Sequence, residues 1–169
     1  LMNNAENDAV SELTYISITR TPDEVLREIK LTFPEARYNG LFKKLKIISL
    51  AEVYFKESIV PMRWITDKKL TAAELKTEKD ILTQLTQVIE TCGENSQIFL
   101  ESFTDLARLT REKINWNDFI DITKGFRKLC IKRNMVLMGL LTANVLDKAK
   151  EEELFDQADG VFIFEWVIE

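Results

Sequence analysis

The chain has 169 residues, of which 46% are hydrophobic and 30% are charged, a balance typical of one soluble globular domain. Its net charge of −5, with acidic and basic residues interleaved, makes nucleic acid or an anionic membrane an unlikely partner. The chain contains no histidine, so the commonest general base and metal ligand is missing. No apolar run approaches the roughly 20 residues of a membrane span, and the N-terminus lacks a secretory stretch, so we expect a cytoplasmic protein.

The first half of the chain alternates predicted strands and helices. Residues 13–19 (LTYISIT) carry enough β-forming side chains for a strand. Thr21 and Pro22 then open a helix, with Thr21 as the cap and Pro22 in the first turn. Residues 45–50 (LKIISL) predict a second short strand, and a short helix followed by a loop fits residues 51–65.

The second half continues this alternation with longer helices. Helical spacing of apolar residues predicts helices over 71–92 and over 116–133, and Gly93 lies where the first of these should end. Short apolar runs predict strands over 97–100 and 135–141. A charged helix over 146–157 follows the second of these strands.

A final apolar run, residues 161–167 (VFIFEWV), predicts a strand that closes the sheet. Strands that are apolar along most of their length, alternating with helices, favour a parallel sheet covered on both faces. We therefore expect an α/β fold with three α/β/α layers, formed by one domain over residues 13–169 after an N-terminal tail over residues 1–12. Cys92 and Cys130 lack the spacing of a zinc or disulfide framework, so both are expected to be reduced thiols.

Three segments resemble the RecA/KaiC-like branch of the P-loop ATPases. Residues 13–26 (LTYISITRTPDEVL) look like the strand and helix that follow the phosphate-binding helix in that family. Residues 97–106 (QIFLESFTDL) resemble its Walker B strand, with Glu101 at the aspartate position. Residues 138–166 are similar to the next strand, a loop and the strand that closes the family's core. The resemblance implies a RecA-like core, with a mainly parallel sheet, that lacks the first β-α unit.

The departures from the family pattern argue against hydrolysis of ATP. The phosphate-binding sequence GxxxxGK[ST] occurs nowhere in this chain. Thr19 and Arg20 stand where the family has a pair of glutamates, and neither can serve as the base that activates water. Glu101 keeps a carboxylate, but its extra methylene displaces that group from the metal position. The resemblance therefore implies no catalytic residue, no metal and no cofactor.

An alternative follows if the phosphate-binding loop lies upstream. Leu1 precedes Met2, so either Met2 is the natural start or the chain is a piece of a longer protein. In the second case the parent protein binds ATP and magnesium, with Glu101 as the magnesium-site carboxylate. A third interpretation is an α/β enzyme of another class, which the absence of histidine and of a clear nucleophile disfavours.

The candidate site lies where the strands end. Open α/β sheets bind ligands beside the carboxyl ends of their strands, which is where Glu101, Ser102, Arg20, Thr142 and Asn144 are expected. These five residues predict a small polar pocket, in which an ion pair between Arg20 and Glu101 occupies the region of the missing metal. A structural interpretation competes with this one, because Glu101 and Ser102 can also cap the helix that follows them.

Two further features concern partners. The basic residues Lys124, Arg127, Lys128, Lys132 and Arg133 lie near the end of the helix over 116–133, where cations also stabilise the helix dipole. The absence of a first β-α unit is expected to uncover a strand edge and an apolar face. We therefore expect self-association or a protein partner, in an archaeal-type RecA/KaiC-like paralogue that acts as a regulatory or assembly module. A RecA-like core also requires the strand of Glu101 to be central, beside the strand of Leu13.

Overall fold

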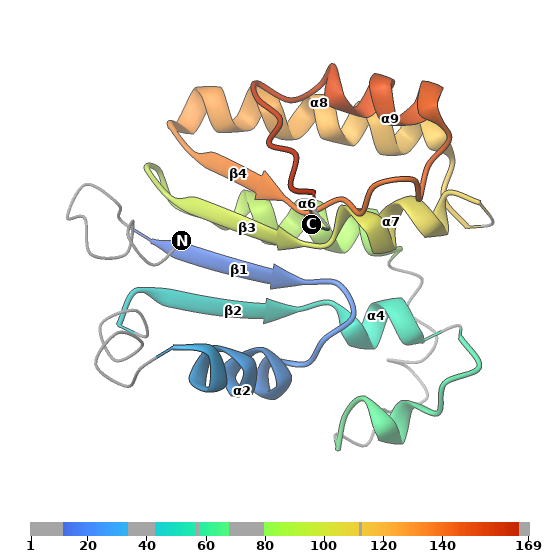
Figure 1. The fold of residues 1–169 in the computed structure, drawn as a ribbon. Coiled ribbons are helices and arrows are strands. Elements are labelled where there is room, and N and C mark those ends of the chain that lie inside the picture. Colours follow the sequence, from blue (N-terminus) through green and yellow to red (C-terminus); the bar gives the residue numbers. More distant parts are fainter. Residues whose placement is uncertain (1–11, 34–42, 57, 68–79, 112, 166–169) are drawn as a thin grey trace, which may run out of the picture.

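The computed structural model describes residues 12–33, 43–56, 58–67, 80–111 and 113–165. Within these residues a four-stranded parallel sheet has the order β2-β1-β3-β4 (Figure 1). The strands are β1 (Leu13–Ser17), β2 (Leu45–Ser49), β3 (Gln97–Glu101) and β4 (Val136–Gly139). The expected α/β fold with a parallel sheet is confirmed, and the strand of Glu101 is an inner strand beside the strand of Leu13.

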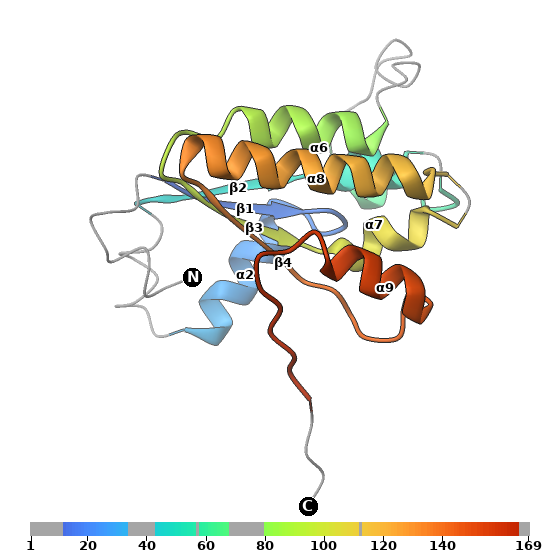
Figure 2. The ribbon, with the colours of Figure 1, turned by 90° about the horizontal axis from the view of Figure 1, so that it is seen from above.

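Helices lie on both sides of this sheet, as expected for three layers. Figure 2 shows α6 (Ile81–Glu90) and α8 (Trp116–Arg133) side by side on one face, and α2 (Pro22–Thr32) on the other. Figure 1 shows α2 running beside β2, away from β4. The shorter helical segments are α4 (Ala51–Phe55), the 3-10 helix η1 (Met62–Trp64), α7 (Phe103–Leu109) and α9 (Lys148–Phe155).

Local sequence explains where the two best-defined helices begin and end. Thr21 and Glu24 form a capping box at the start of α2, in which each side chain accepts a hydrogen bond from the other residue's backbone amide. Asn115 caps α8 by accepting from the amide of Asn117. Asn134 ends α8 in the left-handed conformation, with φ of 52°, which asparagine tolerates better than most residues. The bounds predicted for α8 are confirmed.

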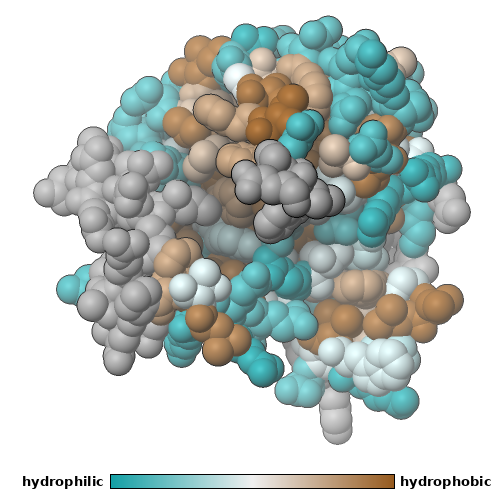
Figure 3. All heavy atoms as spheres, in the orientation of Figure 1, coloured by the Kyte–Doolittle hydropathy of each residue, from teal (hydrophilic) through white to brown (hydrophobic). Residues whose placement is uncertain are grey.

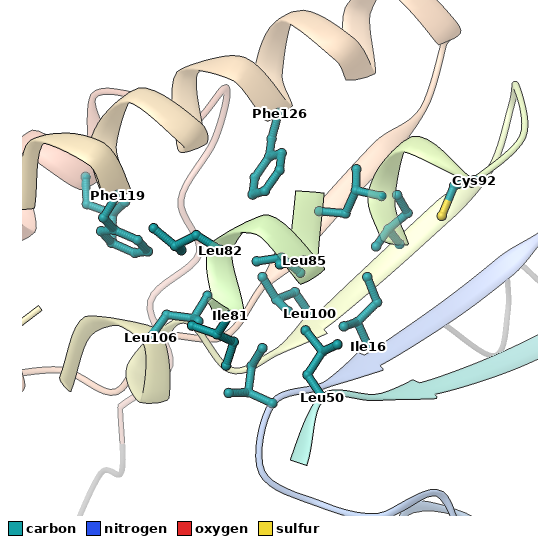
Figure 4. Packing of buried hydrophobic residues seen from close by; sticks show 14 of the residues in the cluster. Ile16, Leu50, Ile81, Leu82, Leu85, Cys92, Leu100, Leu106, Phe119 and Phe126 are labelled. Atoms are coloured by element: carbon teal, nitrogen blue, oxygen red, sulfur yellow. The ribbon is translucent and has the colours of Figure 1, made fainter. Parts of the chain in front are cut away.

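The main core lies between the sheet and the pair α6 and α8 (Figure 4). Ile16 from β1 and Leu100 from β3 are fully buried there, and Leu85 from α6 and Phe119 from α8 pack against them. Each such side chain contributes about 1.5–3 kcal/mol of burial free energy. A smaller cluster on the opposite face joins Leu13 to α2 and β2.

Two predicted elements differ from the structure. The helix predicted over 71–92 is not continuous, because Asp80 is extended and its carboxylate accepts from the amide of Thr83, which starts α6 at Ile81. The earlier part of that prediction, and most of the tail over residues 1–12, lie outside the described residues. The predicted closing strand is wrong over residues 161–165, which are exposed and belong to no strand. Among the described residues, β4 pairs with β3 alone, and residues 161–165 form no pairing with its other edge.

Within the part of the chain that the structure describes, no helix has both the length and the apolar character needed to cross a bilayer.

A close contact explains the glycine in β4. A Cβ atom on Gly139 would collide with the ring of Phe103, which also packs edge-on against Phe119 with centroids 6.1 Å apart. We predict that Gly139→Ala lowers the free energy of unfolding by about 1–3 kcal/mol, because the Phe103 ring must move out of a packed core. Urea unfolding measures this change.

Gly160→Ala is the matched control, because a Cβ on Gly160 meets nothing within 4 Å. Its expected effect is below about 0.5 kcal/mol. Equal effects of the two substitutions would contradict the role given to Gly139.

Candidate functional site

The loop after β1 is held at the carboxyl end of the sheet by two serines. The backbone amide of Arg20 donates to Oγ of Ser17 at 3.0 Å, and its carbonyl accepts from Oγ of Ser49 at 2.7 Å. Ser17 and Ser49 are the last residues of β1 and β2, and Ser17 also lies in register with Glu101 at the end of β3. This backbone anchoring brings the Arg20 side chain to the end of β3.

Arg20 and Glu101 form the predicted ion pair. Nε of Arg20 donates to Oε2 of Glu101 at 3.0 Å, and Nη2 makes a second, shorter contact with the same oxygen. Only 30% of the Arg20 side chain and 23% of the Glu101 side chain are exposed, so the pair is substantially shielded from water. Glu28 of α2 also pairs with Arg20, through Nη1.

Tyr15 is the third member of this cluster, and sequence reasoning missed it. Its hydroxyl donates to Glu101 and accepts from Nη2 of Arg20 at 2.9 Å. Tyr15 lies two residues before Ser17 on β1, so both side chains face the same side of the sheet. Side chains alternate between the two faces of the sheet along β1, and this alternation identifies Tyr15 as a neighbour of Glu101 once β1 is known to pair with β3.

The cluster raises the pKa of two of its members, Tyr15 and Arg20. Burial, followed by the hydrogen bond and the charge of Glu101, raises the pKa of Tyr15 well above its ordinary value of 10.0. Burial by itself lowers the pKa of Arg20, but the contacts with Glu101 and Tyr15 outweigh it and raise that pKa. Tyr15 is therefore a neutral donor and Arg20 a permanent cation, and the carboxylate they both contact is already occupied.

Ser102 caps a helix, as its structural interpretation predicted. Its Oγ accepts from the amide of Asp105 at 3.2 Å and donates to the Asp105 carboxylate at 2.9 Å, at the start of α7. Thr19 makes a longer contact, 3.4 Å, with the same carboxylate. The peptide bond between Glu101 and Ser102 is cis. Glu101 does not cap α7, because its carboxylate is directed to Arg20 and Tyr15.

Thr142 and Asn144 are not part of this cluster. The amide of Thr142 donates to Oγ1 of Thr104 at 2.8 Å, and the two hydroxyls are 3.1 Å apart, so this threonine is bound to α7. Asn144 is exposed in a turn, with φ of 63°. Of the five residues predicted for a pocket, Arg20 and Glu101 pair with each other, Ser102 caps α7, and Thr142 and Asn144 form no hydrogen bond or ion pair with them among the described residues.

Within the described ranges, no group of three or more cysteine, aspartate or glutamate side chains gathers closely enough to hold a metal ion. Cys92 and Cys130 are free thiols, and burial raises the pKa of both.

The coupling between Arg20 and Glu101 can be measured with a double-mutant cycle. We predict that Arg20→Met and Glu101→Gln each lower the free energy of unfolding by about 1–3 kcal/mol, because each leaves a shielded polar group without its partner. The double variant should lose less than the sum, with a coupling of about 0.5–3 kcal/mol.

The control cycle uses Arg127 and Asp159, which pair at 2.6 Å with side chains 45% and 71% exposed. Their coupling should fall below about 1 kcal/mol, because water screens exposed pairs. A coupling for Arg20 and Glu101 no larger than the control would contradict the claim that shielding from water strengthens this pair.

Tyr15 gives a pH prediction. Above about pH 10 the unfolded chain loses the Tyr15 proton while the folded chain keeps it, so the free energy of unfolding falls as pH rises through this range. Tyr15→Phe should make that fall less steep in chemical unfolding experiments, and should remove one late-titrating tyrosine from the ultraviolet titration of the folded chain. Tyr54→Phe is the comparison, because burial raises the pKa of Tyr54 by a smaller amount. Identical slopes for wild type and Tyr15→Phe would contradict this assignment.

Scans against protein-family models, the curated proteins and the solved structures find no match to this chain.

Proposed function

We propose that this chain is a non-hydrolysing RecA/KaiC-like domain that acts as a protein-binding or assembly module. The observation that carries the proposal is an apolar surface at one edge of the sheet. Four consecutive apolar residues, Val161 to Phe164, are 45–90% exposed, and Val136 in β4 and Leu140 just after it are 50% and 47% exposed. Among the described residues, β4 pairs with β3 only, so its other edge is unpaired there. We call these six residues the edge surface.

The position of the edge surface explains why it is uncovered. Leu137 packs into the main core, so the alternating residues Val136, Met138 and Leu140 face the side of the sheet that carries α2. Because α2 lies beside β2, it does not reach β4 (Figure 1). Figure 3 shows hydrophobic atoms gathered over this part of the molecule, and Figure 2 shows the segment after α9 pointing away from the sheet.

An exposed apolar strand edge favours a protein partner over a small ligand. Unpaired edges and contiguous apolar patches are rare on monomers unless something covers them, since both promote association. An extended partner segment added beside β4 would gain backbone hydrogen bonds and would bury the apolar side chains of the edge surface. This mode of binding needs no cofactor.

The Arg20 and Glu101 pair supports the non-hydrolysing part of the proposal. In the RecA/KaiC-like resemblance, Glu101 holds the position of a metal-binding carboxylate, and Arg20 replaces a glutamate that activates water. Here the carboxylate contacts a guanidinium and a tyrosine hydroxyl. A positive charge in that place repels magnesium, so the pair opposes the arrangement that hydrolysis needs.

A photoreactive residue tests the edge surface in the cells that make the protein. We predict that such a residue at Phe164 forms discrete adducts with a protein, and that Val136→Lys strongly reduces their yield, because a charge on the edge surface opposes apolar contact. The control position is Lys148 on α9, whose side chain is 88% exposed. Equal yields at both positions would contradict a specific surface.

The alternative is an ATP-binding domain whose phosphate-binding loop lies upstream of Leu1, and the position of Glu101 at the end of an inner strand favours it. Calorimetric titration of the natural full-length gene product with magnesium and ATP separates the two functions. The proposal expects neither binding nor phosphate release. Tight magnesium-dependent binding with turnover would overturn it.

A further inference from the structure

An open groove lies between helices α6 and α8, on the face of the molecule away from the edge surface. Its volume is about 700 Å³, and Thr86 of α6 forms part of its wall. Along α8 its floor is apolar, formed by Ile122, Gly125, Phe126 and Leu129. Figure 2 shows the two helices lying side by side along this face.

Charge is distributed along the groove with opposite signs at its two ends. Asp118 and Asp121 line one end, and Lys128 and Lys132 line the other. Among the described residues, Asp118, Lys128 and Lys132 take part in no ion pair, while Asp121 is paired with Lys124 at 3.2 Å. Glu90 of α6 also lies at the lysine end, so two lysines and one glutamate leave that end with a net charge of +1.

These residues are symmetric about Gly125. Asp118 and Lys132 each lie seven residues from it, which is about two helical turns, so both are on the same face of α8 as the glycine. Ile122 and Lys128 each lie three residues from it. A helix whose face carries acids before its midpoint and bases after it is complementary to its own antiparallel copy.

Gly125 has no role within its own chain that explains it. Glycine destabilises the interior of a helix relative to alanine, yet a Cβ atom on Gly125 would meet nothing within 4 Å. Internal packing therefore does not require a glycine here. A second helix that crossed α8 at this point would require a glycine, because the missing side chain allows the two backbones to approach closely.

We infer that this groove is the interface of an antiparallel, two-fold dimer of the chain, with Gly125 at the axis. The symmetry places Asp118 of each copy against Lys132 of the other, so that the same ion pair forms twice. The two apolar floors face each other between these pairs. This inference goes beyond the proposed function, because it uses a face of the molecule that the edge surface does not include.

Sedimentation equilibrium of the purified chain tests the dimer by charge reversal. The wild type is expected to dimerise reversibly. Asp118→Lys and Lys132→Asp should each raise the dissociation constant by about tenfold or more. Each substitution gives residues 118 and 132 the same charge, so both of the symmetric contacts between the two copies become repulsive. The double variant should return the constant to near the wild-type value, which only a contact between residues 118 and 132 across the interface produces. Gly125→Gln should also abolish the dimer.

Matched variants separate these effects from general surface charge and folding. Asp23→Lys replaces an acid in the first turn of a helix, as Asp118→Lys does. Lys148→Asp makes the same charge change on α9 that Lys132→Asp makes on α8. Both should leave the constant within about twofold of wild type, as should Phe164→Lys in the edge surface. Thermal unfolding shows whether Gly125→Gln still folds.

A chain that stays monomeric up to about 0.5 mM would overturn the inference. So would a dimer that survives Gly125→Gln and both single charge reversals. A dimer abolished by Phe164→Lys alone would assign self-association to the edge surface instead. The adducts predicted at Phe164 do not depend on α8, so the failure of one proposal is distinguishable from the failure of the other.

Discussion

The parallel pairing of β1 with β3 is the constraint on which the rest of the structure depends. It aligns Ile16 with Leu100, which places the fully buried side chains of both strands under α6 and α8. The same register aligns Ser17 with Glu101 at the ends of the two strands. One set of backbone hydrogen bonds therefore determines both the main core and the polar cluster at the carboxyl end of the sheet.

The polar cluster and the core stabilise each other through this pairing. Arg20 is held by serines at the ends of β1 and β2, and its guanidinium spans to Glu101 at the end of β3. Three neighbouring strands are thereby joined at the edge where α/β proteins usually bind ligands. An ion pair in that position favours a structural role, because the Arg20 guanidinium and the Glu101 carboxylate already contact each other and Tyr15.

The uncovered surfaces have a common physical origin. Because the sheet has four described strands and α2 lies at the β2 side, the face of the sheet beside β4 has no helix over it. The apolar segment after α9 does not pair with β4 and stays exposed. On the opposite face, α6 and α8 pack on the sheet and leave a groove between their own outer surfaces. The two proposed contacts use these two separate surfaces.

The sequence by itself determined the features that depend on neighbouring residues. The bounds of α8, the cap of α2 at Thr21 and the capping role of Ser102 follow from residues within one or two turns. Local patterns were less reliable where a tertiary contact decides, as in residues 161–165, whose strand-like composition leads to no strand because the segment does not pair with β4. The bound on α6 failed for a local reason, because Asp80 interrupts an otherwise helical pattern.

Only the tertiary structure decided which distant side chains meet. The ion pair of Arg20 with Glu101 was expected from the resemblance, but its third member, Tyr15, becomes apparent only from the register of β1 and β3. The loop carrying Thr142 turned toward Thr104 instead of Glu101, which no local pattern indicates. The physical reason is that helix periodicity and capping act over a few residues, whereas contacts between residues 20 and 101 span 81 positions and depend on how strands are ordered in the sheet.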